Sequence, residues 1–82
     1  MFEYNICNQA DAELFYKQCL ALEKHLQGLQ VQEPIEDVDG TMVQRYDHSR
    51  GMIIVKNDMQ VDALYVISEF DLLPYFEKEK SL

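Results

Sequence analysis

The chain has 82 residues, of which 48% are hydrophobic and 27% charged, and this supports one small core but not two domains. Fifteen acidic against seven basic residues leave a net charge of -8, which argues against direct binding to nucleic acid or to an anionic membrane surface. No apolar run approaches the roughly twenty residues that cross a bilayer. We therefore expect a single domain over residues 1–82.

The first predicted element is a strand over residues 2–7. Phe2, Tyr4 and Ile6 alternate with polar residues, as the side chains of a half-buried strand do. Asn8 breaks this alternation and is a candidate N-cap for the helix that follows.

A helix is predicted from Asn8 to about Gln27, with one apolar face. Its apolar residues recur every three or four positions, as in a helix that lies on a hydrophobic core. Leu14 and Leu20 lie off this apolar stripe, so we expect either that they are exposed or that the helix is covered on more than one side. The residues expected to face the core are Ala12, Phe15, Cys19, Leu22 and Leu26.

The opposite face of this helix is polar and is expected to face solvent. Glu13 and Lys17 are spaced for an ion pair across one helical turn, and Glu23 is expected on the same exterior. Gly28 is placed to leave the helix in a left-handed conformation.

The second half of the chain predicts an antiparallel meander. Residues 30–34 also alternate, but Pro34 lacks an amide hydrogen, which restricts this segment to an edge strand or an extended loop. Three further strand-like runs are separated by short turn-forming segments, and connections this short favour antiparallel neighbours. These runs cover residues 41–46, 52–56 and 61–68.

A short helix is expected to end the domain, beginning near Asp71. Pro74 then falls within the first turn, where its missing amide hydrogen is no loss, and residues 78–82 are expected to fray. The predicted fold is α+β in the order β-α-β-β-β-α, with a mainly antiparallel sheet of three or four strands packed against one long helix.

No motif for catalysis, for a metal or for a cofactor is visible in the chain. Cys7 and Cys19 are twelve positions apart, and neither His25 nor His48 has a second His or Cys within four residues. The three glycines stand alone, and no serine lies in an activating motif. We expect no catalytic residue, no metal and no cofactor, and two unpaired thiols in a reducing compartment, the cytoplasm.

Acidic residues are concentrated in two stretches that contain no Lys or Arg, residues 25–44 and 57–77. Apolar residues such as Ile35, Val38 and Phe70 lie among these acids. An apolar anchor ringed by carboxylates suits docking on a basic protein, because burial supplies affinity and charge steers the encounter. The candidate partner-binding residues are Glu33, Glu36, Asp37, Asp39, Glu69, Phe70 and Asp71.

These features favour a small, acidic, non-enzymatic protein that binds a partner with a basic surface. It would act as an inhibitor, an antitoxin-like neutraliser or an adaptor, and a sharper version is a nucleic-acid mimic that blocks a nucleic-acid-binding protein. An acidic surface that only maintains solubility explains the charge equally well. The alternatives are a structural or regulatory subunit bound through an apolar patch and a small enzyme that works as an oligomer.

Overall fold

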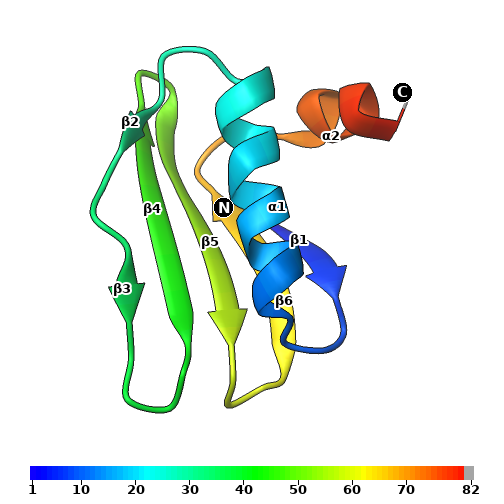
Figure 1. Cartoon of the computed structure of the whole chain (residues 1–82). Coiled ribbons are helices and arrows are strands. Elements are labelled where there is room, and N and C mark those ends of the chain that lie inside the picture. Colours follow the sequence, from blue (N-terminus) through cyan, green and yellow to red (C-terminus); the bar gives the residue numbers. More distant parts are fainter. Residues whose placement is uncertain (81–82) are drawn as a thin grey trace.

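The computed structural model describes residues 1–80, and their side chains through residue 76. The chain forms an antiparallel sheet with the long helix packed across one face (Figure 1). In chain order the elements are β1 (Phe2–Cys7), α1 (Ala12–His25), β2 (Gln30–Val31), β3 (Ile35–Glu36), β4 (Met42–His48), β5 (Gly51–Asp58), β6 (Ala63–Ser68) and α2 (Leu73–Lys80).

The α+β class and the antiparallel meander of β4, β5 and β6 are confirmed. Within the described residues the sheet has six strands in the order β1-β6-β5-β4-β2, and β3 pairs with another part of β4. The expected three or four strands therefore undercount the sheet. Residues 30–36 form two very short edge strands separated at Pro34, which cannot donate to a strand ladder.

Helix α1 begins later than the sequence predicts, because Asp11 and not Asn8 is its N-cap. The Asp11 carboxylate accepts a hydrogen bond from the Leu14 amide at 3.1 Å. The Asp11 amide in turn donates to the Asn57 side chain on β5 at 2.8 Å, which fixes the start of the helix on the sheet. Asn8 instead accepts a hydrogen bond from the Asn5 side chain at 2.6 Å.

The end of α1 lies two residues before the predicted Gln27. The amide of Leu26 donates to the Leu22 carbonyl at 2.9 Å, and the backbone of Leu26 is already extended. Gly28 does have a left-handed φ of +79°, but it lies two residues beyond the C-cap, so the chain leaves the helix at Leu26 and not at Gly28 as predicted.

The hydrophobic core lies between α1 and the central strands of the sheet. Four of the five residues predicted to face the core are buried, whereas Ala12 is exposed because it lies at the first position of the helix. Alternate residues of β5 and β6 meet them from the sheet, as the two-residue period of a strand requires. The buried apolar residues are Phe15, Cys19, Leu22, Leu26, Tyr46, Ile53, Val55, Leu64, Val66, Phe70 and Leu72.

Helix α2 is held against β1 by Tyr4. The Tyr4 hydroxyl donates to the Asp71 carboxylate at 2.7 Å and accepts from the Leu72 amide at 2.8 Å. Asp71 also accepts from the Leu73 amide at 3.0 Å and so caps α2, and the hydrogen bond from Tyr4 lowers the pKa of its carboxyl. The helix continues to Lys80, and the last two residues of the segment expected to fray, 81–82, lie outside the described residues.

Candidate functional site

Six of the seven predicted partner-binding residues lie at two separate ends of the sheet, and Glu33 lies at neither end, in the segment between β2 and β3 beside the middle of β4. Met42, which follows the acidic β3–β4 turn, pairs with Asn57 at one end of β5. Ser68, which precedes the second acidic group, pairs with Ile53 near the other end of β5. Glu36, Asp37 and Asp39 therefore do not share a surface with Glu69, Phe70 and Asp71, although both sets lie in base-free stretches of the sequence.

The second set, Glu69 to Asp71, holds the fold together. Glu69 accepts a hydrogen bond from the Met52 amide at 2.7 Å, and Asp71 caps α2. Phe70 is only 6% exposed, and the Arg50 guanidinium lies 4.8 Å from its ring centroid. The Phe70 ring is thus covered by the protein itself and is not presented to a partner.

The first set surrounds the tight turn between β3 and β4. Asp37 accepts from the Val38 amide at 2.8 Å, and Asp39 accepts from the Thr41 amide at 2.9 Å. Hydrogen bonds from the Thr41 amide and hydroxyl lower the pKa of Asp39, so its carboxylate stays ionised at neutral pH. The Thr41 hydroxyl also accepts from the Met59 amide at 3.0 Å and thereby joins this turn to the β5–β6 turn.

The β5–β6 turn adds two carboxylates that the sequence-based set omits, Asp58 and Asp62. Burial raises the pKa of Asp58, but hydrogen bonds from the Tyr65 hydroxyl and from backbone amides, with the charge of Lys56, outweigh it and lower the pKa. Asp62 accepts from the Ala10 amide at 2.8 Å. Both lie in the second base-free stretch, but only the strand register shows that they lie beside the β3–β4 turn.

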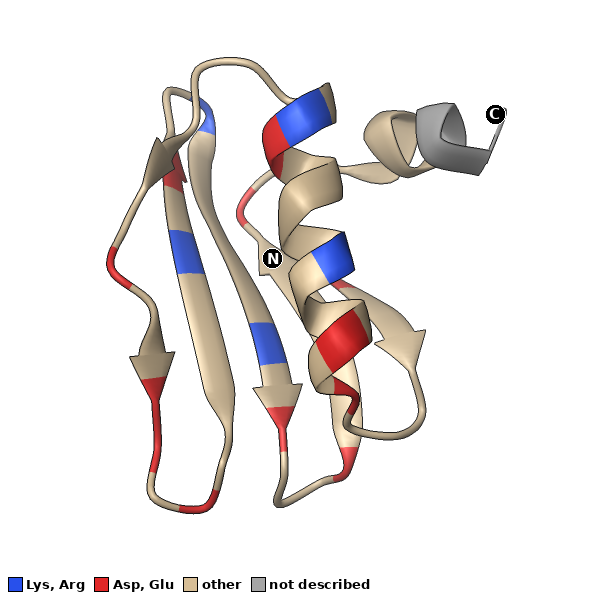
Figure 2. Ribbon diagram, in the orientation of Figure 1, with Lys and Arg blue, Asp and Glu red and all other residues tan. Residues whose placement is uncertain are grey.

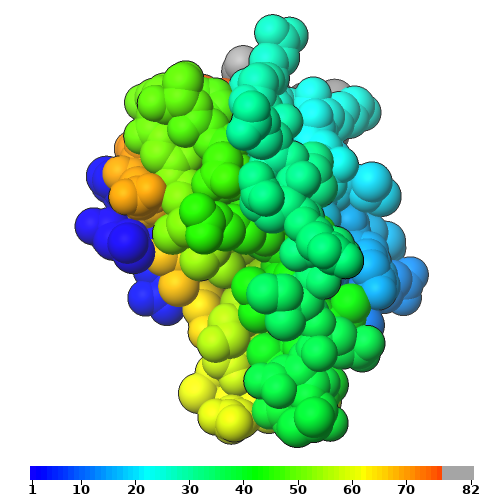
Figure 3. Space-filling view, turned by 90° about the vertical axis from the view of Figure 1, so that its left-hand side faces the viewer, coloured from blue at the N-terminus to red at the C-terminus, as the bar shows by residue number. Residues whose placement is uncertain are grey.

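We call residues 37–40 together with residues 58–62 the acidic turn pair. Its two turns lie side by side at one end of the sheet, and they carry acidic but no basic residues (Figures 2 and 3). Val38, Met59 and Val61 expose apolar side chains among the carboxylates. Apolar groups and negative charge therefore occur together here, as the sequence predicts for Val38.

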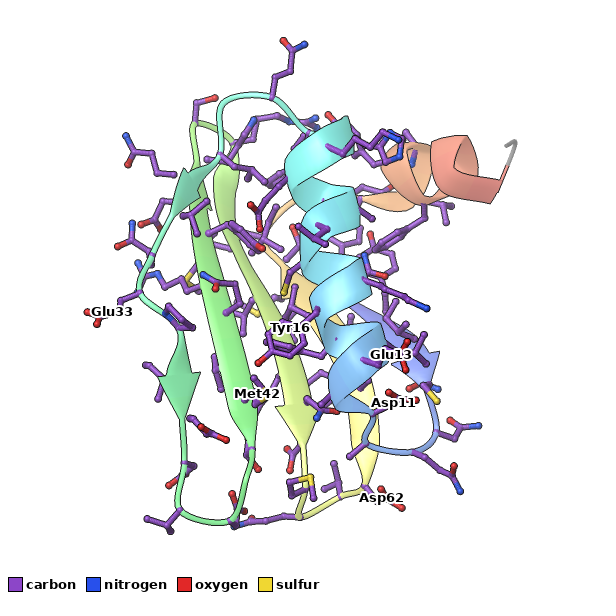
Figure 4. The ribbon with its side chains drawn as sticks, in the orientation of Figure 1. Asp11, Glu13, Tyr16, Glu33, Met42 and Asp62 are labelled. Atoms are coloured by element: carbon purple, nitrogen blue, oxygen red, sulfur yellow. The ribbon has the colours of Figure 1, made fainter. Side chains whose placement is uncertain are left out.

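A groove of about 430 Å³ lies beside the acidic turn pair, between α1 and the edge formed by β3 and β4. We call it the α1–β3 groove. Tyr16 and Leu20 line it from the helix and Ile35 from the edge strand, with exposed fractions of 55%, 65% and 64%. Figure 4 shows Tyr16 on α1 and Met42 on β4, two residues that line this groove.

Two carboxylates flank the α1–β3 groove, Glu23 on the helix and Glu36 on β3, and no Lys or Arg lines it among the described residues. Glu23 accepts a hydrogen bond from the buried Tyr46 hydroxyl at 2.7 Å. The helix pattern predicts an exterior position for Glu23 but not this contact with the core. Burial and then this hydrogen bond raise the pKa of Tyr46, which therefore remains a neutral donor. The groove thus combines an apolar lining with negative charge on both walls.

The described residues include two free cysteines, Cys7 and Cys19. Burial raises the pKa of Cys19 to about 11, so its thiol stays protonated at neutral pH and is a poor nucleophile. The described residues contain no group of three or more His, Cys, Asp or Glu placed to hold a metal ion. Nor is any described helix long and apolar enough to cross a membrane.

Comparison of the chain with family models, with curated proteins and with solved structures finds no match.

Proposed function

We propose that this protein is a small, acidic, non-enzymatic binding domain that docks on the basic surface of another protein. The contact is made by the α1–β3 groove and the adjoining acidic turn pair. The single observation that carries the proposal is the exposure of Tyr16, Leu20 and Ile35 around a groove with Glu23 and Glu36 on its walls. By occupying a basic surface, the protein would act as an inhibitor, a neutraliser or an adaptor.

The groove favours a partner segment in which an apolar side chain is flanked by Arg or Lys. Burying one Leu or Phe side chain contributes about 1.5–3 kcal/mol, and the exposed groove residues offer the surface for this. The Tyr16 ring adds a face on which a guanidinium stacks for about 0.5–1 kcal/mol. Glu23 and Glu36 supply the opposite charge and set the orientation of the segment.

The acidic turn pair extends this attraction beyond the groove. Its carboxylates act on approaching charges within about one Debye length, roughly 10 Å at 0.1 M salt. They speed association more than they slow dissociation, so the binding rate is expected to fall as salt increases. A nucleic-acid-binding protein is one such partner, because its phosphate-binding surface is basic.

A second candidate function is that of a structural or regulatory subunit bound through an apolar patch. It is favoured by exposed apolar residues along the β2–β3 edge, where Val31, Ile35 and Val38 follow one another closely in the sequence. In that case apolar burial dominates, and salt has little effect on binding.

Charge removal from the groove walls tests the proposal. The probe is a short synthetic peptide in which leucine and arginine alternate, and its affinity is measured by calorimetry. The double variant E23Q/E36Q is expected to bind at least about tenfold more weakly, a loss of about 1.4 kcal/mol. Glutamine retains an acceptor for the Tyr46 hydroxyl, so the fold is expected to survive.

The matched control is E3Q/E33Q, which removes the same charge from exposed positions outside the groove. It is expected to change the affinity less than about threefold. Equal weakening by both double variants would mean that only net charge attracts the peptide. Weakening by Leu20→Ser but not by E23Q/E36Q would instead favour the subunit bound through an apolar patch.

A further inference from the structure

A second groove, of about 440 Å³, lies between α1 and the end of β1. We call it the α1–β1 groove. Its charge is opposite to that of the α1–β3 groove, because Lys17 and Lys24 line it and no described acidic residue does. Ile6, Leu14 and Ala21 provide its apolar surface.

This concentration of positive charge is unusual for a chain with a net charge of -8. Of the three lysines whose side chains are described, two, Lys17 and Lys24, line this one groove. Lys17 also lies 3.5 Å from Glu13, but both side chains are largely exposed. An ion pair this exposed is worth little and is readily exchanged for another anion.

Gln18 in the same groove has an unsatisfied hydrogen-bond donor. The residue is only 8% exposed, and its Nε2 atom is buried without a partner among the described residues. Leaving such a donor unpaired destabilises the folded state, and buried polar groups in folded proteins generally have partners. An acceptor supplied from outside the chain would remove this cost.

The helix spacing arranges these groups along one line. Leu14, Gln18, Ala21 and His25 recur every three or four positions and so share a face of α1. From Leu14 to His25 this face extends for about 16 Å at the helical rise per residue. The unsatisfied amide of Gln18 therefore lies one helical turn from the apolar Leu14, on the helix segment that carries Lys17 and Lys24.

We propose that the α1–β1 groove binds a small aliphatic monocarboxylate. The carboxylate lies between Lys17 and Lys24 and accepts a hydrogen bond from the Gln18 side chain, which turns about its terminal torsion to meet it. The alkyl chain covers Leu14 and Ile6. Charge complementarity and the unpaired donor select this ligand over a cation or a neutral chain of the same length.

Titration of the full chain with decanoate, below its micelle concentration, tests this proposal by heteronuclear NMR. Saturable shifts are expected at Ile6 and along Leu14 to His25, together with a downfield shift of the Gln18 side-chain amide protons. Acetate lacks the alkyl chain and decylammonium lacks the carboxylate, so both are expected to bind at least tenfold more weakly. Equal binding of decylammonium, or shifts confined to the α1–β3 groove, would overturn the proposal.

Two variants separate binding from folding. Gln18→Met removes the unpaired donor at nearly constant shape, so it is expected to raise the melting temperature of the free chain and to weaken decanoate binding at least tenfold. K17Q/K24Q is expected to weaken binding by a similar factor. The control R45Q/K56Q removes two positive charges outside the α1–β1 groove and is expected to change the affinity for decanoate less than twofold. Unchanged decanoate affinity in K17Q/K24Q contradicts the proposal even if Gln18→Met does not fold.

Discussion

Replacing Leu22 by Ala is expected to lower the free energy of unfolding by about 2–5 kcal/mol. Leu22 is 1% exposed and lies in the core where α1 meets the sheet, so the truncation leaves a cavity that the surrounding residues fill only in part. A domain of this length has a total stability of about 4–12 kcal/mol, so the loss is a large fraction of it. Leu26, which is also buried, is expected to behave in the same way.

Urea denaturation followed by circular dichroism measures this loss. Leu20→Ala is the matched control, because the residue is on the same helix and 65% exposed, and it is expected to cost less than about 0.5 kcal/mol. A loss below about 0.5 kcal/mol at both Leu22 and Leu26 would show that α1 does not bury this face.

Gly51→Ala is the second substitution with a large expected effect. It is expected to lower the free energy of unfolding by about 2–4 kcal/mol, through backbone strain and a close contact together. Gly51 has a φ of +147°, a conformation that residues with a side chain rarely adopt. A Cβ atom at this position would also lie 2.7 Å from the Cβ of Glu69. Since Glu69 accepts a hydrogen bond from the neighbouring Met52 amide, it cannot move away without breaking that contact.

Gly28→Ala provides the comparison for Gly51. Gly28 also has a positive φ, but the nearest atom to its Cβ position is a His48 ring atom at 3.9 Å, so only the backbone term applies. Its expected cost is about 1 kcal/mol. Thermal denaturation of the two variants separates the cost of backbone strain from the cost of the close contact. Equal losses of stability would mean that the contact with Glu69 is not the reason why position 51 requires glycine.

Local periodicity was sufficient to predict the α+β class, the long helix and the antiparallel meander of β4, β5 and β6. The apolar spacing that includes Phe15 and Leu22 correctly identified the buried face of α1, and the alternation from Phe2 to Ile6 correctly identified β1. The predicted N-cap was wrong because Asn8 and Asp11 are both residue types that favour the N-cap position. The choice between them depends on the hydrogen bond from the Asp11 amide to the Asn57 side chain, 46 positions away. Such a contact has no local signal.

The edge of the sheet was less predictable than its centre. Gln30 and Val31, like Ile35 and Glu36, pair with β4 over two residues only. The alternation over residues 30–34 indicated an edge strand or an extended loop, but it could not show that the pairing is divided into two such short strands. Pro34 was interpreted as restricting this segment to an edge strand or an extended loop, and the segment does form the edge of the sheet, but the sequence could not show that pairing resumes beyond Pro34.

The candidate site was predicted only in part, because its residues come together through the register of the sheet. The stretches without Lys or Arg were visible in the sequence. The sequence did not show that Asp58 and Asp62 lie near Asp39 at one end of the sheet, whereas Glu69 lies at the other end. For the α1–β3 groove, one signal was available: Leu20 falls off the apolar stripe of α1, and it lines the groove.

Mapping the contact surface tests the docking proposal most directly. In a heteronuclear NMR titration with the alternating leucine and arginine peptide, we expect the largest amide shifts along Tyr16 to Glu23 and Ile35 to Met42. E23Q/E36Q should reduce them, and E3Q/E33Q should leave them in place. Shifts that instead centre on Glu69 to Asp71, or that spread evenly over all acidic positions, would contradict the assignment of the α1–β3 groove as the docking site.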